Sequence, residues 1–431
     1  MKIIKNACVF QKLLAILLLL TTVSFSQSLL SVRYPTGTTF PLTTAAARMG
    51  GAGAGLSDPY LISSLNPANL GTIRQSVYTL SMNADRRWIH EGDESVLLGS
   101  FSPSFIGFAF PMGGAGTLAA NFRQSGSNRF AFQEIDTFVH VPDPGFPGKI
   151  QNIEVWPKFD RHLTFSSWEL GWGIELFRRL SLGLTYQFGQ YQNRSVRSDV
   201  LHTTGVISSL DSLQNNQMNS ALSGGFLLRI RNLGFGVSAI YPFMGDLKSQ
   251  RTIRGLVQDQ NGNFSIRPGE PEREFDTTYS LQLPPSGIIG ASWTFNQRLR
   301  TALDFSLVMW DSYYWSDAPT FVFEEGMLQN ALGISAGVEF IPQPNLLSAR
   351  YFQTVHYSGG LAFRQLPIDG DWEGSFSLGL GLPLGGMGIV DISVETGLRR
   401  SAKESDIREN FIRLNFGMSG GRVWRRSTTQ L

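Results

Sequence analysis

The feature that most constrains this chain is a two-residue alternation of large apolar with small or polar side chains, which recurs from Gln75 almost to the end. In the stretch 180–189, leucine, tyrosine and phenylalanine alternate with serine, glycine, threonine and glutamine. A period of two places the two kinds of side chain on opposite faces of a β-strand. The sequence therefore predicts an all-β protein, and the same pattern recurs at 222–230, 376–382, 390–398 and 412–418.

The N-terminus carries the three parts of an export signal. Three lysines lie within residues 1–12, and Leu13 to Leu20 is a purely apolar run. The small residues that follow predict cleavage before Gln27, so residues 1–26 are expected to be a signal peptide outside the fold. The apolar run is too short to span a bilayer as a helix.

Export changes the composition of the remaining chain. The single cysteine, Cys8, leaves with the signal, so the exported chain has no disulfide. Loss of three of the 36 basic residues leaves 33 against 34 acidic ones, and a net charge of −1 argues against a nucleic-acid partner. Forty-six glycines and 12% aromatic residues are typical of large sheets of alternating strands. These features predict a barrel in the outer membrane of a Gram-negative bacterium, with outer-membrane lipid around it.

We predict a transmembrane antiparallel β-barrel of about 14 strands over residues 75–420, followed by a periplasmic tail, 421–431. Short turns alternate with connections that include three long ones at 128–160, 196–216 and 245–279, which we place on the outer side. One strand contains Pro284-Pro285 and is expected to kink there or to begin after it. The strands are expected at 75–87, 97–112, 115–127, 161–176, 180–195, 217–231, 233–244, 280–295, 299–314, 328–341, 354–365, 371–383, 386–399 and 408–420.

Tryptophans near the predicted strand ends are typical of the aromatic girdles at the two membrane interfaces. The outer girdle is expected to contain Trp88, Trp310, Trp315 and Trp372, and the inner girdle Trp293 and Trp424. Ordinary core or loop packing is the alternative for these side chains.

The segment 27–74 precedes the strands and is rich in small residues. Such a segment cannot build a core of its own, because it offers few large apolar side chains. We expect it to lie inside the barrel as a plug. Its distinctive residues are Gly50, Gly51, Gly53 and Gly55, followed by the rigid turn Asn66-Pro67-Ala68.

Three places in the chain resemble the long-chain fatty-acid transporter family of outer-membrane proteins, the FadL type that includes the toluene-channel relatives such as TodX. The Gly/Ala-rich run with its Asn-Pro-Ala turn is similar to the hatch of that family. Leu283 to Ala291, followed by Leu299 to Trp310, is similar to a Leu-Pro strand start and the strand after it. Residues 408–417 resemble the last strand of the PorV-like branch, which is associated with protein secretion.

The resemblance implies passive uptake of small hydrophobic molecules, such as fatty acids or aromatic hydrocarbons, with the Asn66-Pro67-Ala68 turn as a pivot of the plug. A structural turn that only begins the barrel is the other interpretation. A second hypothesis is a PorV-like barrel that does not transport and acts as a scaffold or shuttle for a secretion-system protein. A soluble β-sandwich is a third, because alternation alone also fits a sandwich.

Enzyme chemistry finds little support in the sequence. Residues 417–421 match G-x-S-x-G, but no helix is expected after them, so the nucleophile geometry is missing. The five histidines share no ligand spacing, and we expect neither a metal nor a cofactor. Charges on the small-residue face should point into the lumen, where they hold the plug or bind a polar headgroup: Arg229, Asp304, Asp391, Glu395 and Arg413.

Overall fold

The computed structural model describes residues 42–91, 94–133, 137–142, 150–177, 179–201, 208–258, 264–266, 272–312, 314–315, 328–344, 349–368, 370–385, 388–401 and 407–422. The predicted signal peptide, residues 27–41 of the predicted plug and residues 423–431 of the predicted tail lie outside these ranges. In the part of the chain that is described, no helix is long and apolar enough to cross a membrane.

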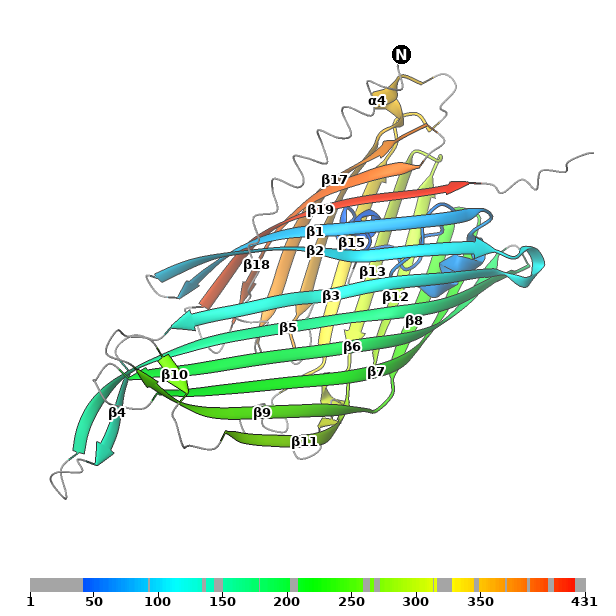
Figure 1. Ribbon diagram of the computed structural model, residues 1–431. Coiled ribbons are helices and arrows are strands. Elements are labelled where there is room, and N and C mark those ends of the chain that lie inside the picture. Colours follow the sequence, from blue (N-terminus) through cyan, green and yellow to red (C-terminus); the bar gives the residue numbers. More distant parts are fainter. Residues whose placement is uncertain are drawn as a thin grey trace, which may run out of the picture.

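The chain forms a closed antiparallel barrel of fourteen strands, as the sequence predicted, and the last strand pairs with the first along its whole length (Figure 1). The strands of the wall are β1 (Ser76–Glu91), β2 (Glu94–Pro111), β3 (Thr117–Gln133), β5 (Ile150–Leu176), β6 (Leu180–Leu201), β7 (Ser208–Ile230), β8 (Leu233–Pro242) continued by β9 (Gly245–Gln258), β11 (Arg273–Gln282) continued by β12 (Ser286–Phe295), β13 (Leu299–Val308), β15 (Ala331–Phe340), β16 (His356–Gln365), β17 (Trp372–Pro383), β18 (Ile389–Arg400) and β19 (Ile407–Arg422).

The large apolar side chains face outward, toward lipid. On β6, Leu182, Leu184, Tyr186 and Phe188 are exposed, while the small residues between them face the lumen. From Gln190 onward the outward side chains of the same strand are polar. A continuous apolar band round a closed barrel is the surface of a membrane-spanning protein, and it excludes the soluble sandwich, whose apolar faces would lie against each other.

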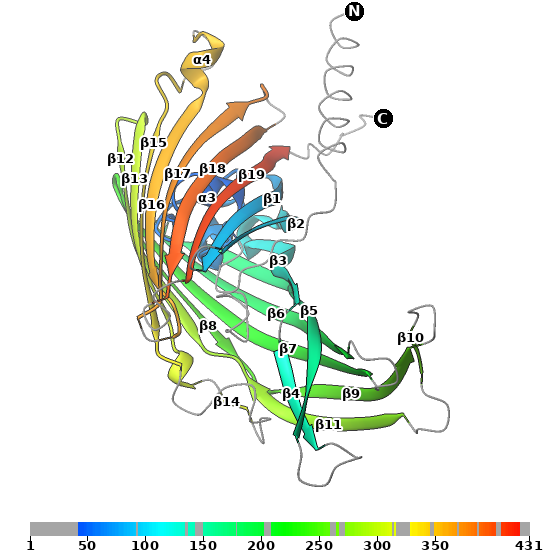
Figure 2. The same cartoon turned by 90° about the vertical axis from the view of Figure 1, so that its left-hand side faces the viewer.

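The sequence predicted long loops at 128–160, 196–216 and 245–279, and this is wrong, because much of each segment is strand. β3, β5, β6, β7, β9 and β11 continue past the apolar band as an outer extension (Figures 1 and 2). Short strands β4 (Thr137–Pro142) and β10 (Phe264–Ile266) pair at its tip, and β14 (Tyr314–Trp315) pairs near its base. These segments have polar residues on both faces, so the alternation that reveals a half-buried strand is lost.

The opposite rim, on the periplasmic side, has short connections. Its turns contain residues with positive φ, including Phe177, Arg231 and Asn296, where one or two residues must reverse the chain. A 3-10 helix, η2 (Gly113–Ala115), joins β2 to β3. The connection between β15 and β16 is longer and carries α4 (Tyr351–Thr354), which projects beyond the rim (Figure 2).

Candidate functional site

The described part of the N-terminal segment, residues 42–75, lies inside the barrel and crosses it near the periplasmic rim (Figure 2). It contains one turn of helix, α3 (Thr44–Ala47), and a 3-10 helix, η1 (Pro67–Thr72). Apolar plug residues pack against the wall in two clusters, one around Ile62, Leu70 and Ile73 and one around Met49 and Ala52. The plug therefore forms a floor across the lumen.

The side chain of Asn66 both caps the 3-10 helix of the Asn-Pro-Ala turn and anchors the turn to its surroundings. Its Oδ1 accepts from the backbone N–H of Ala68 at 3.0 Å, which caps η1, while Pro67 supplies the fixed φ of the first helical residue. Its Nδ2 donates to the carbonyls of Ala54 at 2.9 Å and Phe226 at 3.0 Å. One side chain thus ties together η1, the glycine-rich run and strand β7.

Glycines on the wall meet the backbone of the plug. A Cβ at Gly236 on β8 would lie 1.9 Å from the carbonyl oxygen of Ala54, and one at Gly183 on β6 would lie 2.2 Å from Pro67. On the plug side, Gly50 has φ +68°, and a Cβ there would lie 2.7 Å from the backbone N of Leu361. Plug and wall are therefore matched at the level of the backbone, and a Cβ would also lie within 3 Å of plug backbone at Gly173, Gly225, Gly234, Gly337 and Gly360.

Arg48 and Asp304 are among the charged groups that fasten the plug to the wall. Arg48 is buried in the plug and pairs with Glu339 on β15 and, at 3.2 Å, with Asp391 on β18. Burial disfavours the charged guanidinium, but the carboxylates of Glu339 and Asp391 outweigh it and raise the pKa of Arg48. On β13, Asp304 Oδ2 accepts from the backbone N–H groups of Gly53 at 2.7 Å and Ala54 at 2.9 Å.

The wall from β16 round to β1 carries a second set of buried charges, which lies nearer the outer side. Arg364 and Arg399 both pair with Glu373, so cations alternate with an anion across β16, β17 and β18. Closer to the plug, Arg413 pairs with Glu395 at 2.9 Å and lies 3.5 Å from Asp85. Each charge has an opposite partner, which is how a wall that faces away from lipid accommodates ionised groups.

The five lumen charges expected from the sequence do not form one site. Asp304 and Asp391 meet the plug, whereas Glu395 and Arg413 belong to the second set. Arg229 lies near the periplasmic rim, where it and Arg74, the last residue of the predicted plug, both pair with Glu175. Arg48 was not singled out from the sequence, because a single arginine in a small-residue run has no pattern to mark it.

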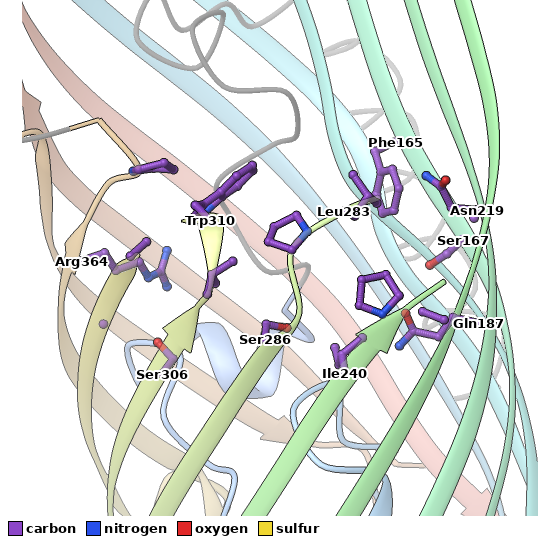
Figure 3. Close-up of a pocket in the computed structure, with 18 of the residues that line it drawn as sticks. Phe165, Ser167, Gln187, Asn219, Ile240, Leu283, Ser286, Ser306, Trp310 and Arg364 are labelled. Carbon is purple, nitrogen blue, oxygen red and sulfur yellow. The ribbon is translucent and has the colours of Figure 1, made fainter. Parts of the chain in front are cut away.

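A cavity of about 190 Å³ lies in the lumen above the plug, toward the outer side (Figure 3). Its apolar lining includes Phe165, Ile240, Leu283, Pro284 and Trp310, and its polar lining includes Arg123 and Arg364. Trp310, at the start of the 3-10 helix η3 (Trp310–Ser312), is only 5% exposed and lines this cavity. The sequence assigned it to the outer aromatic girdle, which is wrong. Trp293 is exposed near the inner rim, as expected.

The wall opens between β2 and β3. These strands pair only from Phe105↔Arg123 down to Pro111↔Thr117, and above that level β2 pairs with β1 and β3 pairs with β5. The seam begins within the apolar band, because Phe101, farther up β2, is still exposed and apolar. Arg123 lies at the foot of the seam, lines the cavity, and donates to the carbonyl of Ser64 in the plug at 2.9 Å. Seam, cavity and plug therefore meet at this residue.

Comparisons with known proteins agree with this architecture. A family model described as BamG matches residues 145–427. Among solved structures, a Pseudomonas aeruginosa FadL homologue has a TM-score of 0.59 at 13% identity, covering 88% of this chain and 97% of that chain. The P. putida toluene transporter TodX has a TM-score of 0.56 at 11% identity and covers 90% of this chain and 100% of that one.

The Ralstonia pickettii toluene transporter TbuX is equally similar, with a TM-score of 0.56, 12% identity, and coverage of 90% of this chain and 100% of that one. At such identities the comparison establishes a common fold, and the resemblance predicted from the sequence is confirmed at that level. No curated protein matches the chain.

Proposed function

The chain belongs to the BamG family, and from that premise and the cavity above the plug we propose that it is an outer-membrane channel for the passive passage of small hydrophobic molecules. The observation that carries the proposal is the continuity of seam, cavity and plug at Arg123. An apolar molecule in the cavity has left water without the need for an energy source. The seam gives it a lateral path into the lipid around the barrel.

The size and lining of the cavity favour a narrow ligand. An engineered apolar cavity of about 150 Å³ takes up benzene, so a cavity of about 190 Å³ fits one aromatic ring or a short length of acyl chain. The solved structures of toluene and monoaromatic hydrocarbon channels with this fold support the same ligand class. Burial of about 150 Å² of apolar ligand surface contributes about 4 kcal/mol at 25 cal/mol per Å².

The plug is the gate in this proposal. Glycines, Asn66 and Asp304 hold it across the periplasmic side of the cavity, so a ligand reaches the periplasm only when the plug shifts. Glycines beside a rigid proline turn suit a small hinge movement. A complete departure of the plug would break every one of these contacts at once, so a local shift of residues 50–55 costs less.

The test is uptake of a labelled monoaromatic hydrocarbon by proteoliposomes that have lipopolysaccharide in the outer leaflet. Ala52 in the plug and Ala302 on β13 belong to one buried cluster, so a disulfide between Ala52→Cys and Ala302→Cys would fix the segment 50–55 to the wall. We expect uptake by the native protein above that of empty vesicles, loss of uptake when this disulfide forms, and recovery after reduction. Uptake equal to that of empty vesicles in the native protein would reject the channel.

A second candidate function, a PorV-like scaffold for a secretion-system protein, is favoured by the outer extension. Its sheet is polar and ends in two strands, β3 and β11, whose outermost described parts pair on one side only. Unpaired edges can accept a strand from another protein. Cross-linking in intact membranes separates the two functions, because a scaffold would yield a stoichiometric protein partner and no uptake.

A further inference from the structure

The seventh and eighth strands of the wall are interrupted at the same level. The last pair between β8 and β12 is Ile240↔Ser286, and the first pair between β9 and β11 is Gly245↔Leu281. Between these pairs, residues 241–244 and 282–285 are not paired with each other in the described ladder. The wall therefore has a second break, separate from the β2–β3 seam.

The break is encoded in the sequence. Pro242, Pro284 and Pro285 have no N–H, so three of the eight positions in the gap cannot donate to a ladder. The remaining backbone is drawn to the outer neighbours instead: Phe243 N donates to Ser220 O on β7 at 2.8 Å, and Met309 N donates to Pro285 O at 2.9 Å. Each strand is thus held on its far side and open on the side of the break.

Both strands change the facing of their side chains across the break. Ser238 and Pro242 are buried on β8, whereas Leu247 and Ser249 are buried on β9, so the inward positions shift from even to odd numbers. The pairing between the two strands nevertheless resumes in its original register. One extra residue is therefore present in each strand at the same height, as in two bulges placed opposite each other.

The break lies at the outer edge of the apolar band. On the outside, Tyr241, Phe243 and Met244 are exposed, and the charged residues Asp246 and Lys248 follow immediately. A backbone carbonyl without a protein partner at this level could reach headgroups and water, whereas it could not in the middle of the bilayer. The break thus faces the outer leaflet.

On the inside, the break borders the cavity. Ile240, Pro242, Leu283, Pro284 and Ser286 all belong to the cavity lining, and Figure 3 shows Ile240, Leu283 and Ser286 around it. Apart from Gln282 and Ser286, the side chains that flank the gap from the lumen to the lipid are therefore apolar or absent. Residues 240–245 and 281–286 carry no charge, so a charged or zwitterionic headgroup would lose its hydration inside the gap without a charged partner there.

We propose that this break is a second lateral portal, through which a single aromatic ring or acyl chain moves between the cavity and the outer leaflet. The inference rests on the proposed channel function and adds where and in what form the ligand crosses the wall. The portal differs from the β2–β3 seam, whose foot carries Arg123, because its own walls are apolar. Ligands that lack polar groups are expected to use the portal.

Disulfides can close each opening in turn, since the mature chain is expected to have no cysteine. Tyr241→Cys with Pro285→Cys closes the portal, because these positions continue the register of the last pair, Ile240↔Ser286, and the neighbours of each line the cavity, so both side chains face outward. Val237→Cys with Ile289→Cys is the matched control: the two residues are paired and exposed to lipid below the break. A third pair, Ser104→Cys with Gln124→Cys, continues the register of Phe105↔Arg123 and closes the foot of the seam.

The readout is protein-dependent uptake of phenylnaphthylamine, whose fluorescence rises on leaving water, by lipopolysaccharide-coated proteoliposomes. We expect oxidation to abolish most of the uptake in the portal pair, reduction to restore it, and the control pair to behave as the native protein. Uptake that survives portal closure and is lost on seam closure would overturn the portal and leave the channel standing. Absence of uptake in the native protein would reject the channel itself.

A second measurement needs no disulfide and no transport. A nitrobenzoxadiazole label on Ser286→Cys is placed at the inner side of the portal, and the same label on Gln365→Cys lies on β16, away from both openings. In vesicles of phosphatidylcholine with brominated acyl chains, we expect quenching at position 286 and not at 365. Equal, weak quenching at both positions would overturn the portal even if the disulfide failed to form.

Discussion

The matching of wall glycines to the plug gives a sharp prediction for Gly236→Ala. A Cβ at this position would lie 1.9 Å from Ala54 O, whereas real Cβ contacts essentially never fall below 3.0 Å, so the plug must retreat by about 1 Å. The matched control is Gly224→Ala, because a Cβ there has nothing within 4 Å. Both changes replace a strand glycine by alanine, so effects on the unfolded chain cancel.

The cost follows from the hydrogen bonds that the retreat breaks. Ala54 N and Gly53 N donate to Asp304 at 2.9 and 2.7 Å, and a shift of about 1 Å takes both beyond hydrogen-bond distance. Hydrogen bonds to a charged group contribute about 1.5–3 kcal/mol, and overpacking costs about 1–3 kcal/mol. Allowing for relaxation, we expect the plug to be destabilised in its seat by about 2–4 kcal/mol.

Hydrogen exchange of the peptide containing residues 50–56, followed by mass spectrometry in detergent micelles, measures this directly. A loss of about 2 kcal/mol raises the exchange rate of amides that open locally about 30-fold. The barrel strands should exchange as in the native protein. Equal exchange of this peptide in Gly236→Ala and Gly224→Ala would refute the idea that backbone contact at the wall seats the plug.

Three further changes test the charges and the membrane band. Asp304→Asn should raise exchange of the same plug peptide, since a neutral amide accepts hydrogen bonds more weakly than a carboxylate; unchanged exchange would contradict this. Arg48→Ala removes the buried guanidinium that pairs with Asp391 and should lower the free energy of unfolding of the barrel by about 3–5 kcal/mol, measured by urea unfolding in micelles, whereas a loss below 1 kcal/mol would count against it. Leu184→Arg places a charge in the lipid band and should lower the free energy of unfolding by about 2–4 kcal/mol, measured in the same way. Gln192→Arg lies above the band and should leave the free energy of unfolding unchanged. Equal losses in the two variants would place the band elsewhere.

Local rules were sufficient for much of the architecture. Alternation located all fourteen strands of the wall, and Pro284-Pro285 marked the kink between β11 and β12. The described part of the small-residue segment, residues 42–74, lies in the lumen as expected. Strand ends were predicted less well: β5 begins at Ile150, eleven residues before the predicted start at 161. The missing residues are polar on both faces in the aqueous extension, so no apolar alternation marks them.

The sequence predicted which residues form the candidate site, but not how they are arranged in it. Glycine, asparagine and aspartate were singled out, but their pairings were not, because a residue pair such as Gly53 and Asp304 is separated by 251 positions. Trp310 illustrates the same limit. Its place near a strand end fits an aromatic girdle as well as a cavity wall, and only its rotation into the lumen distinguishes them.

Side-chain alternation alone shows which face of each strand meets lipid, because it is a property of neighbouring residues and needs no distant contact. The sequence also determined where the wall cannot pair, since proline lacks a donor whatever surrounds it. Only closure of the barrel decided which glycines face the plug, which carboxylates bind its amides and where the cavity opens, because these contacts join strands that are hundreds of residues apart. Their energies depend on the shape that closure creates and not on any local segment.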